Sequence, residues 1–163
     1  PTMHDTLHTR PRKPVRPSQG QRRANYLGSG LLLGSGLLWL VAHHLLPLPE
    51  FAARHPLETW AMRIHGAAAL FGIAVFGSLW ASHLLPAWQH GRHRASGASL
   101  AVAWLLLLLT GYGLYYVPDE DWRAPLSLVH QLAGFGLPLG LGLHVLTVRR
   151  SRRVARMTAA ARP

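Results

Sequence analysis

The chain has 163 residues, of which 49% are hydrophobic and 14% are charged, and its formal net charge is +11. This length allows one domain, and the absence of cysteine excludes disulfide bonds and thiolate-bound metal centres. Nearly all Arg and Lys residues lie outside long apolar stretches. Such segregation is typical of a membrane protein rather than of a soluble core.

Four apolar stretches are each long enough to cross a bilayer, because about 20 helical residues span its hydrocarbon core. Pro118 ends the third stretch, and Pro125 stands where the first turn of a helix would tolerate proline. The stretches are Leu27–Leu46, about Ala61–Pro86 with an extension back to Leu57, Ala98–Val117, and Leu126–Val148. The sequence therefore predicts an all-α protein, a transmembrane four-helix up-and-down bundle.

Basic tails flank this predicted bundle. Residues 1–25 form a basic N-terminal tail, residues 26–148 the transmembrane domain, and residues 149–163 a basic C-terminal tail. The two tails and the Ala87–Gly97 loop hold fourteen of the seventeen Arg and Lys residues. By the positive-inside rule, both termini should be cytoplasmic in a bacterial inner membrane.

The basic tails also bear on the expected partners. They adjoin apolar spans and lack interleaved aromatic residues, so nucleic acid is not an expected partner. Anionic lipid headgroups fit such segments better. The membrane lipids are therefore the partners that the tails predict.

Six of the eleven histidines lie in or at the ends of the predicted helices: His43, His44, His65, His83, His130 and His144. An ionisable side chain at membrane depth is costly and is a functional candidate by default. The spacing from His65 to His83 is about five helical turns, and the spacing from His130 to His144 is about four. Each pair should therefore share one face of its helix. Because the second and fourth helices run the same way, they should offer two imidazole pairs at two depths.

Two facing imidazoles suit low-spin haem, whose iron takes one axial ligand on each side of the ring. Such an iron has no open position and passes electrons. Without cysteine, the CxxCH attachment of c-type haem is impossible, so any haem must be non-covalent. We expect haem between the second and fourth helices, with His65 opposite His130 in the outer half of the membrane and His83 opposite His144 in the inner half.

Glycines near these histidines would let a flat macrocycle approach the backbone, although close helix packing also explains many of them. Gly97 and Gly111 repeat the spacing of the two histidines on the fourth predicted helix. Arginines near the helix ends could pair with haem propionates or with lipid phosphates. The cofactor-binding candidates are Arg63, Gly66, Gly97, Gly111, Arg123, Gly134 and Arg149.

The stretches RIHGAAALFGIAVFGSLWASH, LLLLLTGYGLYY and LVHQLAGFGLPLGLGLH resemble the small bacterial four-helix b-type cytochromes. These are similar in architecture to the cytochrome b of bc complexes and to the membrane subunits of formate dehydrogenases and hydrogenases. The resemblance implies a di-haem subunit that carries electrons between a quinone pool and a partner redox subunit. It makes His65, His83, His130 and His144 the axial ligands of two b haems. Because the dehydrogenase-type subunits take one ligand from their first helix, His43 or His44 is an alternative outer ligand.

Other functions fit parts of the pattern. A proton or metal-ion transporter would also place histidines in a bundle, but usually with embedded acidic partners, and every Asp and Glu lies in a predicted tail or loop. A haem-free anchor subunit would need none of the histidines. There is no nucleotide-binding glycine motif or catalytic constellation. We therefore expect an electron-transfer subunit of a larger oxidoreductase complex rather than an enzyme alone.

Overall fold

The computed structural model describes residues 16–51, 53–89 and 94–160, and every regular element in them is helical. The elements are α1 (Gln19–Leu45), α2 (Pro56–Leu79), the π turn η1 (Trp80–Leu84), α3 (Leu85–Gln89), α4 (Arg94–Tyr116) and α5 (Glu120–Ala160). The predicted all-α class is confirmed.

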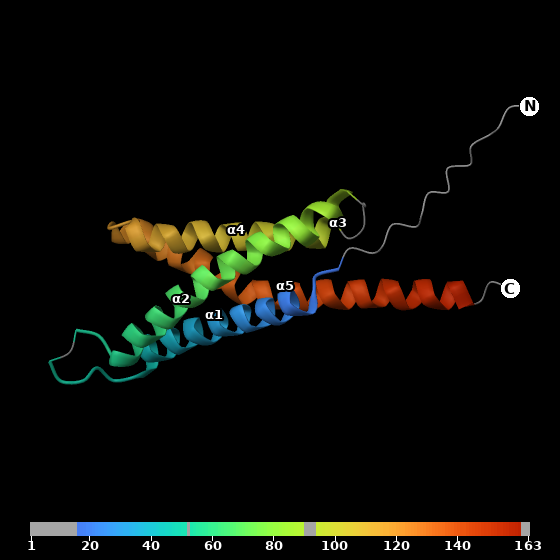
Figure 1. Ribbon diagram of the computed structural model, residues 1–163. Coiled ribbons are helices and arrows are strands. Elements are labelled where there is room, and N and C mark those ends of the chain that lie inside the picture. Colours follow the sequence, from blue (N-terminus) through green and yellow to red (C-terminus); the bar gives the residue numbers. More distant parts are fainter. Residues whose placement is uncertain (1–15, 52, 90–93, 161–163) are drawn as a thin grey trace, which may run out of the picture.

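The helices alternate in direction and pack as two antiparallel hairpins, α1 with α2 and α4 with α5. Figure 1 shows the α1–α2 turn and the α4–α5 turn at one end, which we call the turn end. The start of α1 and the finish of α5 lie towards the other end, which we call the terminal end (Figure 1). Helices pack much more closely within each hairpin than between hairpins. The predicted up-and-down arrangement is thus present, as two paired hairpins.

Four helical segments are long and apolar enough to span a membrane: Gln19–Leu45, Pro56–Gln89, Arg94–Tyr116 and Glu120–Ala160. Few side chains in these segments are buried inside the protein. Large apolar side chains such as Leu70, Leu109 and Leu139 point outward instead, as expected where lipid rather than water surrounds the helices. The four candidate spans indicate a multi-pass membrane protein.

Helix α1 begins at Gln19, before the predicted Leu27, because Ser18 provides an N-terminal cap. The Ser18 hydroxyl accepts from the Gln21 backbone N–H at 3.1 Å, and the Gln21 side chain accepts from the Ser18 backbone N–H at 2.9 Å. This reciprocal capping box satisfies two donors at the helix start. Part of the predicted N-terminal tail is therefore helical.

Helix α5 extends beyond the predicted Leu126–Val148 in both directions. It begins at Glu120, where the Asp119 side chain accepts from the Asp121 backbone N–H at 2.9 Å. Pro125 therefore lies inside the helix rather than in its first turn. At the other end the helix continues to Ala160, because arginine and alanine favour helix even where they are too polar or too small to mark a membrane span.

The seam between α1 and α2 contains most of the buried positions of this hairpin. Small residues repeat along it at helical spacing: Gly28, Ser35 and Ala42 on α1, and Ala61, Ala68 and Gly72 on α2. Small side chains let two backbones approach closely without a large hydrophobic core. Gly28 shows how close, since a Cβ there would lie 3.2 Å from the Phe71 ring of α2.

Candidate functional site

His65 of α2 and His130 of α5 bring the two hairpins together. Their ring centroids lie 6.2 Å apart and their planes make an angle of 66°. In Figure 1, α2 and α5 cross as each runs from the turn end to the terminal end. Two of the four histidines that the sequence predicts as ligands therefore meet.

A hydroxyl group fixes the proton of His65. The Ser35 Oγ lies 2.9 Å from the His65 Nδ1 and donates to the Leu31 carbonyl at 2.6 Å. A serine hydroxyl has one proton, so while that proton goes to the carbonyl, the oxygen can only accept from the imidazole. This arrangement favours the tautomer with hydrogen on the His65 Nδ1 and the lone pair on its Nε2.

His130 has the same arrangement in the other hairpin. The Thr110 Oγ1 lies 2.8 Å from the His130 Nδ1 and donates to the Leu106 carbonyl at 2.7 Å. The proton count again places hydrogen on Nδ1 and leaves Nε2 as an electron-pair donor. Both imidazoles that meet between the hairpins are thus in the form that binds a metal ion.

A glycine follows each hydroxyl residue and faces the same imidazole. A Cβ at Gly36 would lie 3.6 Å from the His65 Cε1, and a Cβ at Gly111 would lie 3.3 Å from the His130 Cε1. The predicted role of Gly111 was room for a macrocycle. In the structure its missing side chain makes room for the His130 ring itself.

His144 is held in the same way. The Ser96 Oγ lies 2.9 Å from the His144 Nδ1, and Gly97 follows Ser96. Ser96 and Thr110 have the same spacing along α4 as their partners His144 and His130 have along the antiparallel α5. This equal spacing explains the repeat that the sequence shows in its glycines. A cavity of about 310 Å³ between these helices includes Ser96 and His144 in its lining.

His83 departs from this pattern. It lies in η1, whose wide turn interrupts the regular helix on which its predicted alignment with His65 depended. Within the described part of the chain, its buried Nδ1 has no hydrogen-bond partner. There is no ring contact between the two described residues His83 and His144, so the inner pair remains a prediction.

The corresponding level of the α1–α2 hairpin is occupied by another polar group. The spacing from Gln21 to Ser35 on α1 equals the spacing from Ser96 to Thr110 on α4. Its amide donates to the hydroxyls of Ser78 and Ser82, each at 2.7 Å. These contacts tie the start of α1 to the end of α2. In this hairpin an amide–hydroxyl cluster therefore stands where the other hairpin has a hydroxyl and a histidine.

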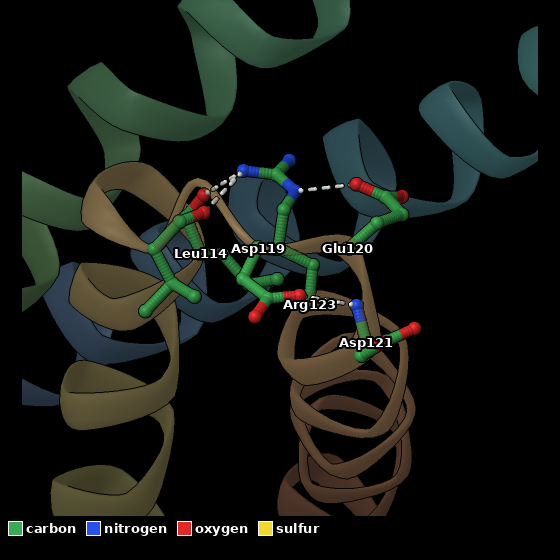
Figure 2. A network of polar contacts seen from close by, with 6 residues as sticks. Leu114, Asp119, Glu120, Asp121 and Arg123 are labelled. Carbon is green, nitrogen blue, oxygen red and sulfur yellow. Dashed lines mark hydrogen bonds and ion pairs between the residues drawn. The ribbon is translucent and has the colours of Figure 1, made fainter.

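Arg123 lies at the turn between α4 and α5, as Figure 2 shows. Its Nη1 donates to the carbonyls of Leu114 at 2.8 Å and Val117 at 3.2 Å, and its Nε lies 3.4 Å from Glu120 Oε2. These contacts satisfy carbonyls at the end of α4. They give Arg123 a structural role beside its predicted role as a propionate partner.

The other predicted cofactor-binding residues lie as follows. The Arg63 guanidinium stacks over Trp60 at 5.0 Å, and Arg149 is exposed on α5. A Cβ at Gly134 would lie 3.8 Å from a Leu107 methyl. No described atom lies within 4 Å of a Cβ built at Gly66 or at Gly97. For these residues the cofactor role remains a prediction.

Glu58 corrects one expectation from the sequence. It lies in the first turn of α2 and is only 7% exposed, whereas the sequence placed every acidic residue in a tail or loop. Its Oε2 lies 3.1 Å from the Nδ1 of His43, which stacks on Trp39 with centroids 4.7 Å apart. The helix starts at Pro56, next to the Leu57 of the predicted extension, because Pro56 fits its first turn and His55 caps it. His43, the alternative outer ligand, is thus paired with a carboxylate.

The hydroxyl partners of the histidines were not found by sequence reasoning. A usable signal was present, because Ser35, Ser96 and Thr110 each precede a glycine on the helix before a histidine-bearing helix.

Among the described residues there is no group of three or more His, Cys, Asp or Glu side chains that could hold a metal ion. The His65–His130 pair supplies two donors, the number that haem iron needs beyond its porphyrin. No protein-family model, no curated protein and no solved structure matches this chain.

Proposed function

We propose that this protein is a membrane-integral cytochrome b subunit that binds haem between His65 and His130 and carries electrons. The separation of the two rings is the main support. Two imidazole nitrogens, each about 2 Å from one metal ion and on opposite sides of it, place their ring centroids about 6 Å apart. The 6.2 Å between the two centroids fits that arrangement.

The chemistry of the donors supports the same cofactor. The hydroxyls of Ser35 and Thr110 bind Nδ1 of each imidazole, so the lone pair on each Nε2 can bind iron. Bound haem would supply a one-electron redox centre. The protein would hold the ring, exclude water from it and close both axial positions, which favours electron transfer over oxygen or substrate chemistry. The looser packing between hairpins would leave room for a flat group between α2 and α5.

A second haem is proposed at the level of His83 and His144, as the resemblance implies. His144 has the same hydroxyl partner type as the first pair. The buried Nδ1 of His83 has no hydrogen-bond partner among the described residues. Such a group is costly in an apolar environment, and a group bound nearby could satisfy it. This level is less well supported than the first, because the two rings do not meet.

The wider assignment follows from the resemblance and the charge distribution. We propose a bacterial inner-membrane protein with cytoplasmic termini that passes electrons between a quinone pool and a redox subunit of a larger complex. Its long basic helix end, with Arg149, Arg150, Arg152, Arg153 and Arg156, would lie on the cytoplasmic side near anionic lipid headgroups.

Proton transport is a second candidate, and the contact between the buried Glu58 and the exposed His43 favours it. An acid and an imidazole joined at the edge of a membrane domain can exchange a proton with water. Against it, the pair lies about two helical turns, or about 10 Å of helix rise, from His65, with the buried Ala61 between them. The two functions differ in whether the purified protein contains haem.

The test is to purify the full chain from membranes and record its absorption spectrum in the oxidised and dithionite-reduced states. We expect a b-type spectrum and a pigment that acid–acetone extracts. His65→Ala and His130→Ala should each remove the same spectral component, while Thr158→Val at the exposed end of α5 serves as the control. A wild-type protein without iron would reject the haem assignment. Proton uptake by liposomes containing that iron-free protein would favour the second candidate.

A further inference from the structure

Three histidines make the same pattern of contacts. On the first helix of a hairpin, a hydroxyl residue bonds to Nδ1 of a histidine on the second helix, and a glycine follows the hydroxyl residue. The three sets are Ser35 and Gly36 with His65, Ser96 and Gly97 with His144, and Thr110 and Gly111 with His130.

Two of these sets have a complete hydrogen-bond chain in the structure. The imidazole N–H donates to the hydroxyl, and the hydroxyl donates to the carbonyl one helical turn earlier. The carbonyls of Leu31 and Leu106 lie inside helices and already accept from the backbone, so they do not need the hydroxyls as caps. By donating its proton to the carbonyl, the hydroxyl of Ser35 or Thr110 leaves its oxygen free to accept from the imidazole. A hydroxyl used only for packing would not have to aim its oxygen at Nδ1 in both hairpins.

We propose that Ser35 and Thr110 are positioning residues that set the redox potential of the group bound between His65 and His130. They hold each imidazole as the Nδ1–H tautomer and in one orientation. By accepting a hydrogen bond from Nδ1–H, they also increase the basicity of Nε2. This inference rests on the proposed haem site. It goes beyond that site by assigning a function to two residues that do not touch the iron.

The direction of the effect follows from the charge on the metal. A more basic nitrogen stabilises ferric iron more than ferrous iron, so the two hydroxyls should lower the midpoint potential. Loss of such a supporting partner typically weakens metal binding 10–100-fold. A tenfold loss confined to the ferric state would raise the potential of a one-electron couple by about 59 mV.

The experiment compares the full-length wild type with Ser35→Ala, Thr110→Val and Thr110→Ser. Ser151→Ala and Thr158→Val are matched controls, because their hydroxyls donate to backbone carbonyls of their own helix. Potentiometric titration of the haem spectrum gives the midpoint potential, and low-temperature electron paramagnetic resonance reports ligand orientation. Ser35→Ala and Thr110→Val should each raise the potential and change the ferric g values. Thr110→Ser and both controls should match wild type.

A second measurement does not need haem. In haem-free protein labelled with ¹⁵N-histidine, the imidazole ¹⁵N–¹H correlations should show His65 and His130 as Nδ1–H tautomers in wild type and as mixtures in the two variants. Variants that keep haem with unchanged potential and g values would overturn the positioning role, as would Nε2–H tautomers in wild type. A wild type that binds no haem but shows the Nδ1–H tautomers would instead reject the proposed haem site.

Discussion

Ser35 in α1 and Thr110 in α4 make equivalent contacts in the two hairpins. Each hydroxyl donates to the carbonyl one helical turn before it and accepts from the imidazole on the next long helix, His65 for Ser35 and His130 for Thr110. The two imidazoles then face each other across the hairpins. The site is therefore built from two similar halves, and the predictions below test whether they act as one.

The first prediction concerns the ligands. His65→Ala and His130→Ala should abolish the same haem component, because one iron needs both axial donors to stay low-spin. His83→Ala and His144→Ala should affect a second component if the inner haem is present. Optical spectra at matched protein concentration measure both. If His65→Ala retained all haem while His43→Ala lost part of it, the outer ligand would belong to α1.

The second prediction uses the glycines as a graded probe of space. Gly111→Ala should disturb the His130 site most, because its Cβ would lie 3.3 Å from the ring, and Gly36→Ala should disturb the His65 site less, at 3.6 Å. Gly34→Ala on α1, with no described atom within 4 Å of its Cβ, is the control. Each change should favour the helix itself by about 0.5–1 kcal/mol.

Because helix propensity improves in all three variants, a loss of haem from Gly111→Ala would have a local steric origin. Haem content per protein and the midpoint potential are the measurements. Equal effects at all three positions would contradict the local explanation.

The third prediction concerns Arg123 at the α4–α5 turn (Figure 2). Arg123→Ala should lower thermal stability by about 1–3 kcal/mol, the scale of hydrogen bonds from a charged group, because the carbonyls of Leu114 and Val117 lose their donor. Haem content should stay near that of wild type. Unchanged stability together with lost haem would instead favour the propionate role. Arg63→Ala provides the comparison at the same end of the bundle.

The fourth prediction concerns quinone exchange at the turn end. If His43 and Glu58 exchange protons with a quinol there, His43→Ala and Glu58→Gln should slow haem reduction by quinol in the reconstituted complex without changing the haem spectrum. Glu58→Gln keeps a hydrogen-bonding group beside His43 but removes its charge. Changes to His90, Arg92 and His93, which lie outside the described residues, test the opposite side. Unaffected rates for both sets would place the quinone site on another subunit.

The fifth prediction concerns topology. A reporter that is active only in the periplasm should give no signal when fused to the C-terminus, because the end of α5 carries several arginines and no acidic residue. A fusion within the 46–55 connection should give a signal. The reversed result would exchange the two sides of the membrane and leave the histidine contacts unchanged.

The sequence by itself determined the number and type of the long elements. Apolar stretches of about 20 residues must satisfy their backbone polar groups internally in lipid, so they form helices whatever their neighbours. Helix periodicity also identified His65 and His130 as residues of the second and fourth spans. Helix ends were less predictable, since the Ser18 cap and the arginine-rich end of α5 extend helices without adding apolar character.

Only the tertiary structure decided which side chains meet. Ser35 and Thr110 become imidazole partners through the rotation and crossing of packed helices, and Glu58 is buried because α1 covers it. The π turn at His83 altered an alignment that regular periodicity had predicted. The hydropathy of a segment depends only on its own residues, so the sequence predicts it directly. A contact between hairpins depends instead on the packing of residues far apart in sequence.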